Sequence, residues 1–160
     1  MDRVNANKYY YFNKSYFQKI IKSNNFKTTL LFVVENKSKK IIGASMFIAT
    51  NSIVQYHLSG TKNEYTKLNA TKLLIDEMRI RATKQGYDFF NLGGGLGGRD
   101  DDPLFNFKSS FSKDFKDFNL WKWITNEKIY NKLISDKESD NAASNYFPLY
   151  RSIEDINVQL

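Results

Sequence analysis

The sequence predicts an α/β fold, and three observations support this prediction. Three apolar segments rich in β-branched and aromatic residues follow one another with short polar turns between them, as in an antiparallel meander. A segment with the apolar spacing of a helix comes next, at 69–85, and a fourth strand-like segment follows at 87–92. A strand, a helix and a strand in succession form a βαβ unit, so the third and fourth strands should run parallel and are expected to splay apart.

The first helix is expected at 13–24. Asn13 can cap it, and Phe12 can pack on Phe17 as a hydrophobic staple. The meander that follows has three expected strands, at 30–35, 41–49 and 53–59. Gly43, inside the second strand, indicates a bulge or a close approach of another part of the chain.

The helix at 69–85 has the clearest signals in the chain. Asn69 can cap its start, and Gly86 falls where a helix-ending glycine belongs. Its expected buried stripe consists of Leu73, Leu74, Met78 and Ala82. Further along, Asp102 is expected to cap a helix at 103–111. The last expected elements are a strand at 118–124, a helix at 127–135 and a tail at 144–151 that packs through its aromatic rings.

Length and composition limit the class of protein. The 160 residues suit a single domain over 1–160, with 151–160 as a frayed tail. The absence of cysteine excludes disulfides, zinc-thiolate sites and a cysteine nucleophile, and the single histidine excludes a multi-histidine metal site, so no metal is expected. No secretory signal and no apolar run long enough to span a membrane are visible, so a cytoplasmic location is expected.

The excess positive charge lies at one end of the sequence. Residues 1–40 contain nine Lys/Arg and two Asp/Glu, whereas the other 120 residues contain fifteen of each. A basic surface for tRNA or another polyanion is one interpretation. A solvated, lysine-rich face is the other, and the lack of alternating arginine and aromatic residues favours it.

The segment GGGLGG at 93–98 indicates a substrate site. It contains the G-x-G-x-x-G spacing of dinucleotide-binding proteins, but carboxylates follow at 100–102 where a helix should open, and they would repel a phosphate. Five glycines in six residues are costly in entropy for a mere connection, so we expect a tight turn beside a substrate. The residues assigned to this substrate site are Tyr56, Ser59, Gly93, Gly94, Gly95, Arg99 and Phe105.

Two residues are candidates for catalysis. His57 ends a strand and can act as a general base, although a structural role is equally compatible with its position. Lys108 lies among phenylalanines, where partial desolvation would let it hold an oxyanion or a phosphate, unless it is an ordinary lysine with its amine in water.

The start of the helix at 69–85 is the expected site for the phosphates of an activated donor, because a helix N-terminus presents free N–H groups. The residues assigned to this donor site are Lys67, Asn69, Ala70, Thr71 and Lys72. The loop lacks the glycines usual at such a site.

The order of these motifs resembles the second GNAT domain of Fem-like proteins, the peptidoglycan-bridge aminoacyltransferases. The resemblance covers about residues 1–151, and its specific part runs from His57 to Phe111. It rests on Tyr56-His57-Leu58-Ser59-Gly60-Thr61, on Phe90-Asn91-Leu92-Gly93-Gly94-Gly95, on Leu104-Phe105, Phe107-Lys108 and Phe111, and on Tyr146-Phe147-Pro148-Leu149-Tyr150-Arg151.

The resemblance implies a mixed, mostly antiparallel sheet with helices on both faces and an N-acyltransferase activity. It implies aminoacyl-tRNA or an acyl-CoA such as acetyl-CoA as donor, an amine of a peptidoglycan precursor or amino sugar as acceptor, and an active-site role for Lys108. Fem-like enzymes usually carry two such domains, so this chain is expected to form a homo-oligomer, to work with a separate first-domain partner or to use a smaller acceptor. The alternative is a non-catalytic half-domain that binds tRNA or another polyanion, or that depends on a partner.

Overall fold

The computed structural model describes residues 11–95, 101–136 and 147–151. It separates into two compact units, Met1–Asp114 and Phe115–Leu160, and each unit is described by itself. The sheet lies wholly within the first unit. The prediction of a single domain over 1–160 therefore stays a prediction.

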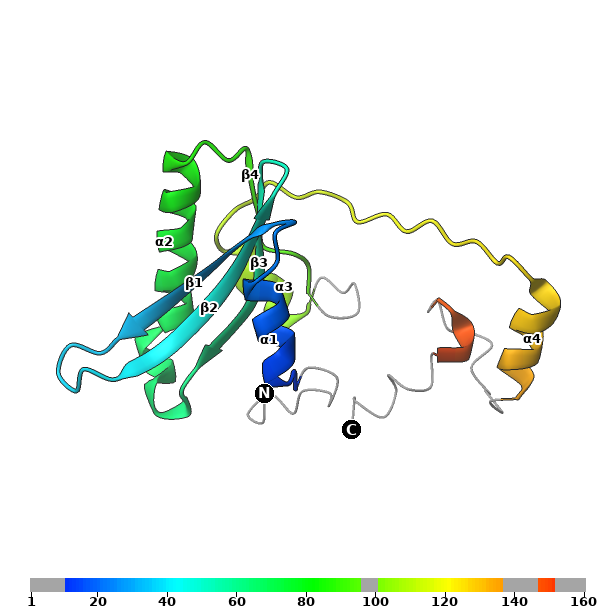
Figure 1. The fold of residues 1–160 in the computed structure, drawn as a ribbon, viewed down its shortest axis with the longest axis horizontal. Coiled ribbons are helices and arrows are strands. Elements are labelled where there is room, and N and C mark those ends of the chain that lie inside the picture. The colour runs from blue at the N-terminus through cyan, green and yellow to red at the C-terminus, as the bar shows by residue number, and fades with distance from the viewer. Residues whose placement is uncertain (1–10, 96–100, 137–146, 152–160) are drawn as a thin grey trace. The chain divides into compact units, whose positions relative to one another are not determined.

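A mixed sheet forms the centre of the first unit, as predicted, and it has four strands (Figure 1). Its strands, in the order β1-β2-β3-β4, are Lys27–Val34, Ile41–Thr50, Ile53–Thr61 and Phe89–Asn91. The first three pair antiparallel through short turns, and β4 pairs parallel to β3 after the helical crossover. Pairing with β3 covers only three residues, so β4 is shorter than the predicted strand at 87–92.

One face of the sheet is covered by α2 (Ala70–Lys84), which is preceded by an unpredicted 3₁₀ helix at Asn63–Leu68. The buried residues that join helix and sheet are Leu31, Phe47, Ala49, Val54, Leu74, Met78 and Ala82. Burying each large side chain of this core stabilises the fold by about 1.5–3 kcal/mol. Helix α2 ends as predicted, because Gly86 has a φ of +74° and the Gly86 and Tyr87 amides donate to the carbonyls of Thr83 and Ala82.

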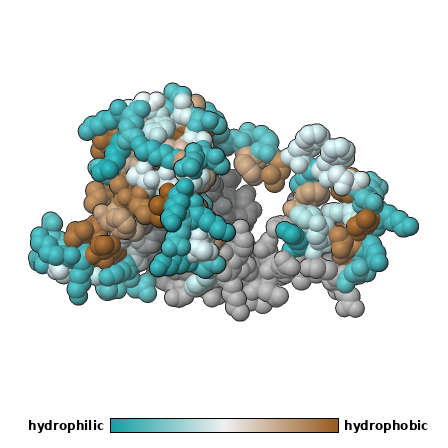
Figure 2. All heavy atoms as spheres, in the orientation of Figure 1, coloured by the Kyte–Doolittle hydropathy of each residue, from teal (hydrophilic) through white to brown (hydrophobic). Residues whose placement is uncertain are grey.

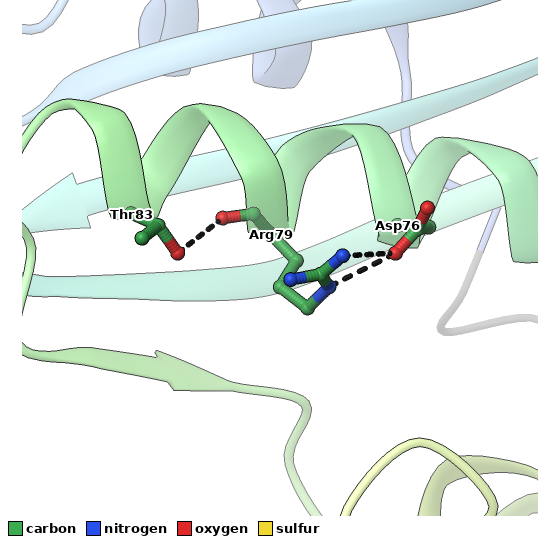
Figure 3. Close-up of polar contacts among 3 residues, drawn as sticks. All are labelled: Asp76, Arg79 and Thr83. Atoms are coloured by element: carbon green, nitrogen blue, oxygen red, sulfur yellow. Dashed lines mark hydrogen bonds and ion pairs between the residues drawn. The ribbon is translucent and has the colours of Figure 1, made fainter.

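The outer face of α2 is polar. Arg79 lies 2.8 Å from Asp76, and the Thr83 hydroxyl donates to the Arg79 carbonyl oxygen (Figure 3). These i,i+3 and i,i+4 contacts are typical of a solvated helix face. Leu73 is 59% exposed, so its predicted burial is wrong: the buried stripe runs through Leu74 and Ile75 instead.

Helix α1 (Lys14–Ile21) covers the opposite face. The Thr28 hydroxyl of β1 donates to the Ile20 carbonyl oxygen, and Thr28 points away from the α2 face to which Leu31 belongs. As predicted, Asn13 caps the helix by accepting from the Tyr16 amide, and the rings of Phe12 and Phe17 meet edge to face 6.4 Å apart. The sheet therefore has helices on both faces.

Part of the α1 face of the sheet is exposed and apolar. Its members, on β1 and at the start of β2, are Leu30, Phe32, Val34 and Ile41, which are 38–54% exposed. Figure 2 shows hydrophobic side chains over these strands, beside the polar surface of α1. Helix α1 thus leaves the outer strands partly uncovered.

Two bulges shape the central strands. Val33 pairs with Gly43 and Val34 with Ile41, so Ile42 is an extra residue in β2. A Cβ added to Gly43 would lie 2.8 Å from the Cβ of Ala70, so the predicted close approach is confirmed as well. In β3, Met46 pairs with Leu58 and Phe47 with Tyr56, which leaves His57 as the extra residue.

The second unit contains α4 (Glu127–Ser135) and a short 3₁₀ helix at Leu149–Arg151. The predicted packing of the aromatic tail is confirmed, since the Tyr130 ring lies 6.0 Å from Phe147 and 5.7 Å from Tyr150. The predicted strand at 118–124 is wrong: these residues form no regular structure. Their aromatic pattern suits a strand, but a strand requires a hydrogen-bonded partner, and here Phe118 and Trp121 are 86% and 90% exposed. Residues 152–160, the predicted frayed tail, lie outside the described part of the chain.

Candidate active site

The two parallel strands of the sheet separate after a short contact. Their pairing ends at Gln55 and Asn91, whereas β3 continues to Thr61. The chain leaves β4 through Gly93, whose φ of +71° is in the left-handed region that favours glycine. From Tyr56 onward, the edge of β3 that faced β4 has no strand partner there among the described residues. This opening confirms the predicted splaying of the strands.

Lys108 lies at this opening. It comes from α3 (Pro103–Ser109), and its Nζ donates to the Gly94 carbonyl oxygen at 2.7 Å. The same Nζ lies 5.8 Å from the centre of the Tyr56 ring, within the range of a cation–π interaction. Partial burial lowers the pKa of the Lys108 amine, and the Asp102 carboxylate partly opposes this shift. The structure thus brings together Lys108, Tyr56 and the glycine turn, all predicted site residues.

Tyr56 links the opening to the core. One side of its ring packs near Phe47, with ring centres 5.8 Å apart, and its hydroxyl bonds to the Ser59 hydroxyl. Burial raises the pKa of the Tyr56 phenol, and the bond to Ser59 opposes this in part. Tyr56 is therefore a neutral hydrogen-bonding group, held on one side by the core and on the other by Ser59.

The glycine turn fits against the start of α3. Asp102 caps this helix as predicted, accepting from the Phe105 amide at 2.7 Å. A Cβ on Gly95 would overlap the Asp102 carboxylate and lie 2.8 Å from the Phe105 Cβ, so only glycine fits there. Gly95 therefore packs directly against the first turn of α3, the helix that carries Lys108. Arg99, also predicted for this site, lies outside the described residues.

His57 has a different environment from Lys108. As the bulged residue of β3, it is re-aimed relative to its neighbours, and its Nε2 lies 2.7 Å from the Tyr16 hydroxyl of α1. Burial lowers the pKa of the His57 imidazole. His57 thus meets α1, while its neighbour Tyr56 meets Lys108. Joint action of Lys108 and His57 on one substrate stays a prediction.

Tyr16 is not among the site residues predicted from the sequence. It is 41 positions from His57 in the chain, and nothing in a single sequence shows that the two meet. The one available signal is the aromatic face of the first helix, which is equally typical of a core-facing stripe.

The residues assigned to the donor site gather where β3 meets α2. The hydroxyls of Thr61 and Thr71 lie 3.2 Å apart, and Lys67 and Lys72 are exposed. Asn69 occupies the cap position, but its side chain donates to the Lys67 carbonyl oxygen instead of capping the helix. Ala70 is buried against Gly43, so only its backbone can reach a ligand.

Asn69 explains how this loop does without glycine. Its φ is +52°, in the left-handed region that asparagine tolerates better than most other residues. The chain therefore enters α2 with a backbone conformation for which glycine is the usual choice.

No group of three His, Cys, Asp or Glu side chains within residues 11–95, 101–136 and 147–151 is placed to hold a metal ion. In the same residues, no helix has both the length and the apolar character needed to cross a membrane.

The fold and the opening beside Lys108 define an α/β domain with polar, partly buried side chains gathered where β3 and β4 separate. Residues 12–118 match the model of the FemAB family. The chain therefore belongs to the FemAB family, as the motifs predicted, and membership indicates a transferase of the aminoacyl type.

A solved structure has a similar fold. It is the crystal structure of a mutant of the BH1408 protein from Bacillus halodurans, with 14% identity and a TM-score of 0.50. The match covers 71% of this chain and 76% of that one. No protein of curated function matches this chain.

Proposed function

We propose that this protein is an N-acyltransferase of the FemAB type, which moves an acyl or aminoacyl group from an activated donor to an amine. The observation that carries the proposal is the opening between β3 and β4, where the Lys108 amine, the Gly94 carbonyl and Tyr56 meet. Membership of the FemAB family supports the same class of reaction.

The proposed reaction is attack of a neutral amine on the carbonyl carbon of an ester or thioester. A C–N bond forms, the carbonyl oxygen becomes an oxyanion, and the C–O or C–S bond to the donor then breaks. The amine proton passes to a base, for which His57 is the candidate, and the departing oxygen or sulfur takes up a proton.

Lys108 is proposed to stabilise the oxyanion. A protonated lysine has three N–H donors, and the Gly94 carbonyl accepts one, so the others can serve an incoming carbonyl oxygen. The β3 amides beyond Gln55 can supply further donors, because pairing with β4 ends there. Partial burial of the amine strengthens such an interaction, since water screens it less.

We propose aminoacyl-tRNA as the donor and the amine of a peptidoglycan precursor as the acceptor, because the family carries out that class of transfer. An acyl-CoA donor is the second candidate. The left-handed turn at Asn69 favours it, because this turn leads the chain into the N-terminus of a 15-residue helix beside Lys67 and Lys72.

Exchange of Lys108 for methionine tests the site. Labelled aminoacyl-tRNA and acetyl-CoA are each offered with a peptidoglycan precursor or an amino sugar, and amide formation is measured. Lys108→Met should lower turnover by about 10²–10³-fold, the usual effect of losing one oxyanion donor. The matched control is Lys113→Met, which removes an exposed lysine just after α3 and should leave turnover unchanged. Equal turnover in wild type and Lys108→Met would overturn the assignment.

A further inference from the structure

Two features of the fold determine the environment of His57: the bulge in β3 and the contact with Tyr16 of α1. It is the extra residue of the β3 bulge, between Tyr56 and Leu58, and has no partner on β2. Its side chain therefore does not have to follow the regular alternation of strand side chains between the two faces of the sheet. Its ring lies 6.2 Å from that of Tyr16 at an interplanar angle of 26°, and the Tyr16 hydroxyl is 2.7 Å from Nε2. That distance is the ordinary length of a hydrogen bond to a hydroxyl.

Tyr16 itself is held from several sides. The Asn13 side chain accepts its backbone amide at 3.0 Å, Phe12 stacks on its ring at 4.1 Å, and Phe17 meets the ring edge-on at 5.4 Å. These contacts involve the backbone and the ring, so they position the hydroxyl without depending on it. Loss of the hydroxyl alone should therefore leave the helix and its packing intact.

We propose that Tyr16 fixes the tautomer of His57: its hydroxyl donates to Nε2 and keeps the ring proton on Nδ1. A phenol O–H is a stronger acid than an imidazole N–H, and an imidazole nitrogen is a stronger base than a phenol oxygen. The bond therefore runs from oxygen to nitrogen, and the neutral ring has its lone pair at Nε2.

This arrangement determines which atom of His57 can act. An imidazole accepts a proton only at the nitrogen that carries the lone pair, which is here Nε2. Because that lone pair accepts the Tyr16 O–H, the proton of the amine acceptor reaches Nε2 through this hydroxyl: the Tyr16 oxygen takes up the amine proton while its own proton passes to Nε2, on the α1 side of the sheet. This last step rests on the proposed function, whereas the tautomer of His57 does not.

The tautomer can be measured directly, because His57 is the only histidine in the chain. Long-range ¹H–¹⁵N correlation spectra of the labelled full-length protein, above the ordinary histidine pKa of about 6.5, distinguish the two neutral tautomers without resonance assignment. Wild type should show the proton on Nδ1. Tyr16→Phe should shift the population toward the Nε2–H form, whereas Tyr65→Phe, which removes a phenol from the 3₁₀ helix before α2, should not.

An Nε2–H ring in wild type, or the same tautomer in wild type and Tyr16→Phe, would overturn the proposal. Turnover gives the second readout: Tyr16→Phe should lower kcat about tenfold or more and leave the KM for the donor unchanged, because only the base is affected. Failure of the wild type to transfer any acyl group would contradict the proposed function, yet the spectra would still decide the role of Tyr16.

Discussion

Single residues in the two central strands determine how closely other elements can pack against the sheet. Gly43 allows β2 and α2 to approach until an added Cβ would lie 2.8 Å from the Ala70 Cβ. Gly60, on the neighbouring strand, has no atom within 4 Å of an added Cβ. The two glycines therefore allow a controlled comparison, because an added methyl group would be crowded at Gly43 and unobstructed at Gly60.

Gly43→Ala should destabilise the protein by about 1–3 kcal/mol, because the new methyl group overpacks the joint between β2 and α2. Gly60→Ala should change stability by less than about 0.5 kcal/mol. Urea unfolding measures both. Equal midpoints for the two variants would show that β2 and α2 can separate at Gly43 without cost.

Burial of His57 predicts a stability that depends on pH. Its folded-state pKa lies below the ordinary value, so between these two values the unfolded chain binds more protons than the folded one. The free energy of unfolding should therefore fall as pH drops through about 6.5 and below.

His57→Gln removes this titration and should lose less stability than wild type between pH about 7.5 and 5. Urea unfolding of both proteins at the two pH values measures how much unfolding free energy each protein loses. The two proteins have the same carboxylates, so the contribution of these groups to the pH dependence cancels in the comparison. An identical loss of stability in the two proteins would mean that folding does not change the pKa of His57.

At the residue scale, the sequence predicts which residues belong to a site better than it predicts which residues contact one another. It places both the glycine turn and Lys108 at a substrate site, and they meet through the 2.7 Å bond from Nζ to the Gly94 carbonyl. Pairing of His57 with Tyr16 could not be predicted, because it depends on a bulge in β3 and on where α1 crosses the sheet.

At the scale of elements, local signals predict most helices well. Caps at Asn13 and Asp102 and the stop at Gly86 each act within a few residues, so the sequence alone shows them. The strand expected at 118–124 shows the limit of this reasoning. Its alternation of large apolar residues is a local feature, but a strand forms only where its backbone can hydrogen-bond to a neighbouring strand.

The start of α2 gives a prediction at this scale. Asn69 holds a left-handed conformation, and its side chain makes one bond to the Lys67 carbonyl oxygen. Asn69→Gly and Asn69→Ala both remove that bond, but only alanine also opposes the conformation. Asn69→Ala should be less stable than Asn69→Gly by about 1 kcal/mol in thermal or urea unfolding. Equal stability of the two variants would contradict a left-handed requirement at this position.

At the scale of the whole molecule, the site and the family match lie almost entirely in one part of the chain. Residues 12–118 match the FemAB model, and the sheet, the opening and Lys108 all lie within Met1–Asp114. The second unit has its own aromatic cluster around Tyr130. The fold could be predicted from the order of elements, whereas the donor and acceptor could not, since one domain architecture serves many acyl transfers.

The proposed function depends on binding of an activated acyl group at the opening beside Lys108. Thermal unfolding of wild type and Lys108→Met with aminoacyl-tRNA, deacylated tRNA, acetyl-CoA and free CoA tests it most directly, because a ligand that binds the folded state raises Tm by mass action. We expect one acylated donor to raise the wild-type Tm more than its deacylated form does, and we expect Lys108→Met to lose this difference. Acyl binding beside Lys108 is ruled out if no acylated donor stabilises wild type more than its deacylated form, or if Lys108→Met keeps the full difference.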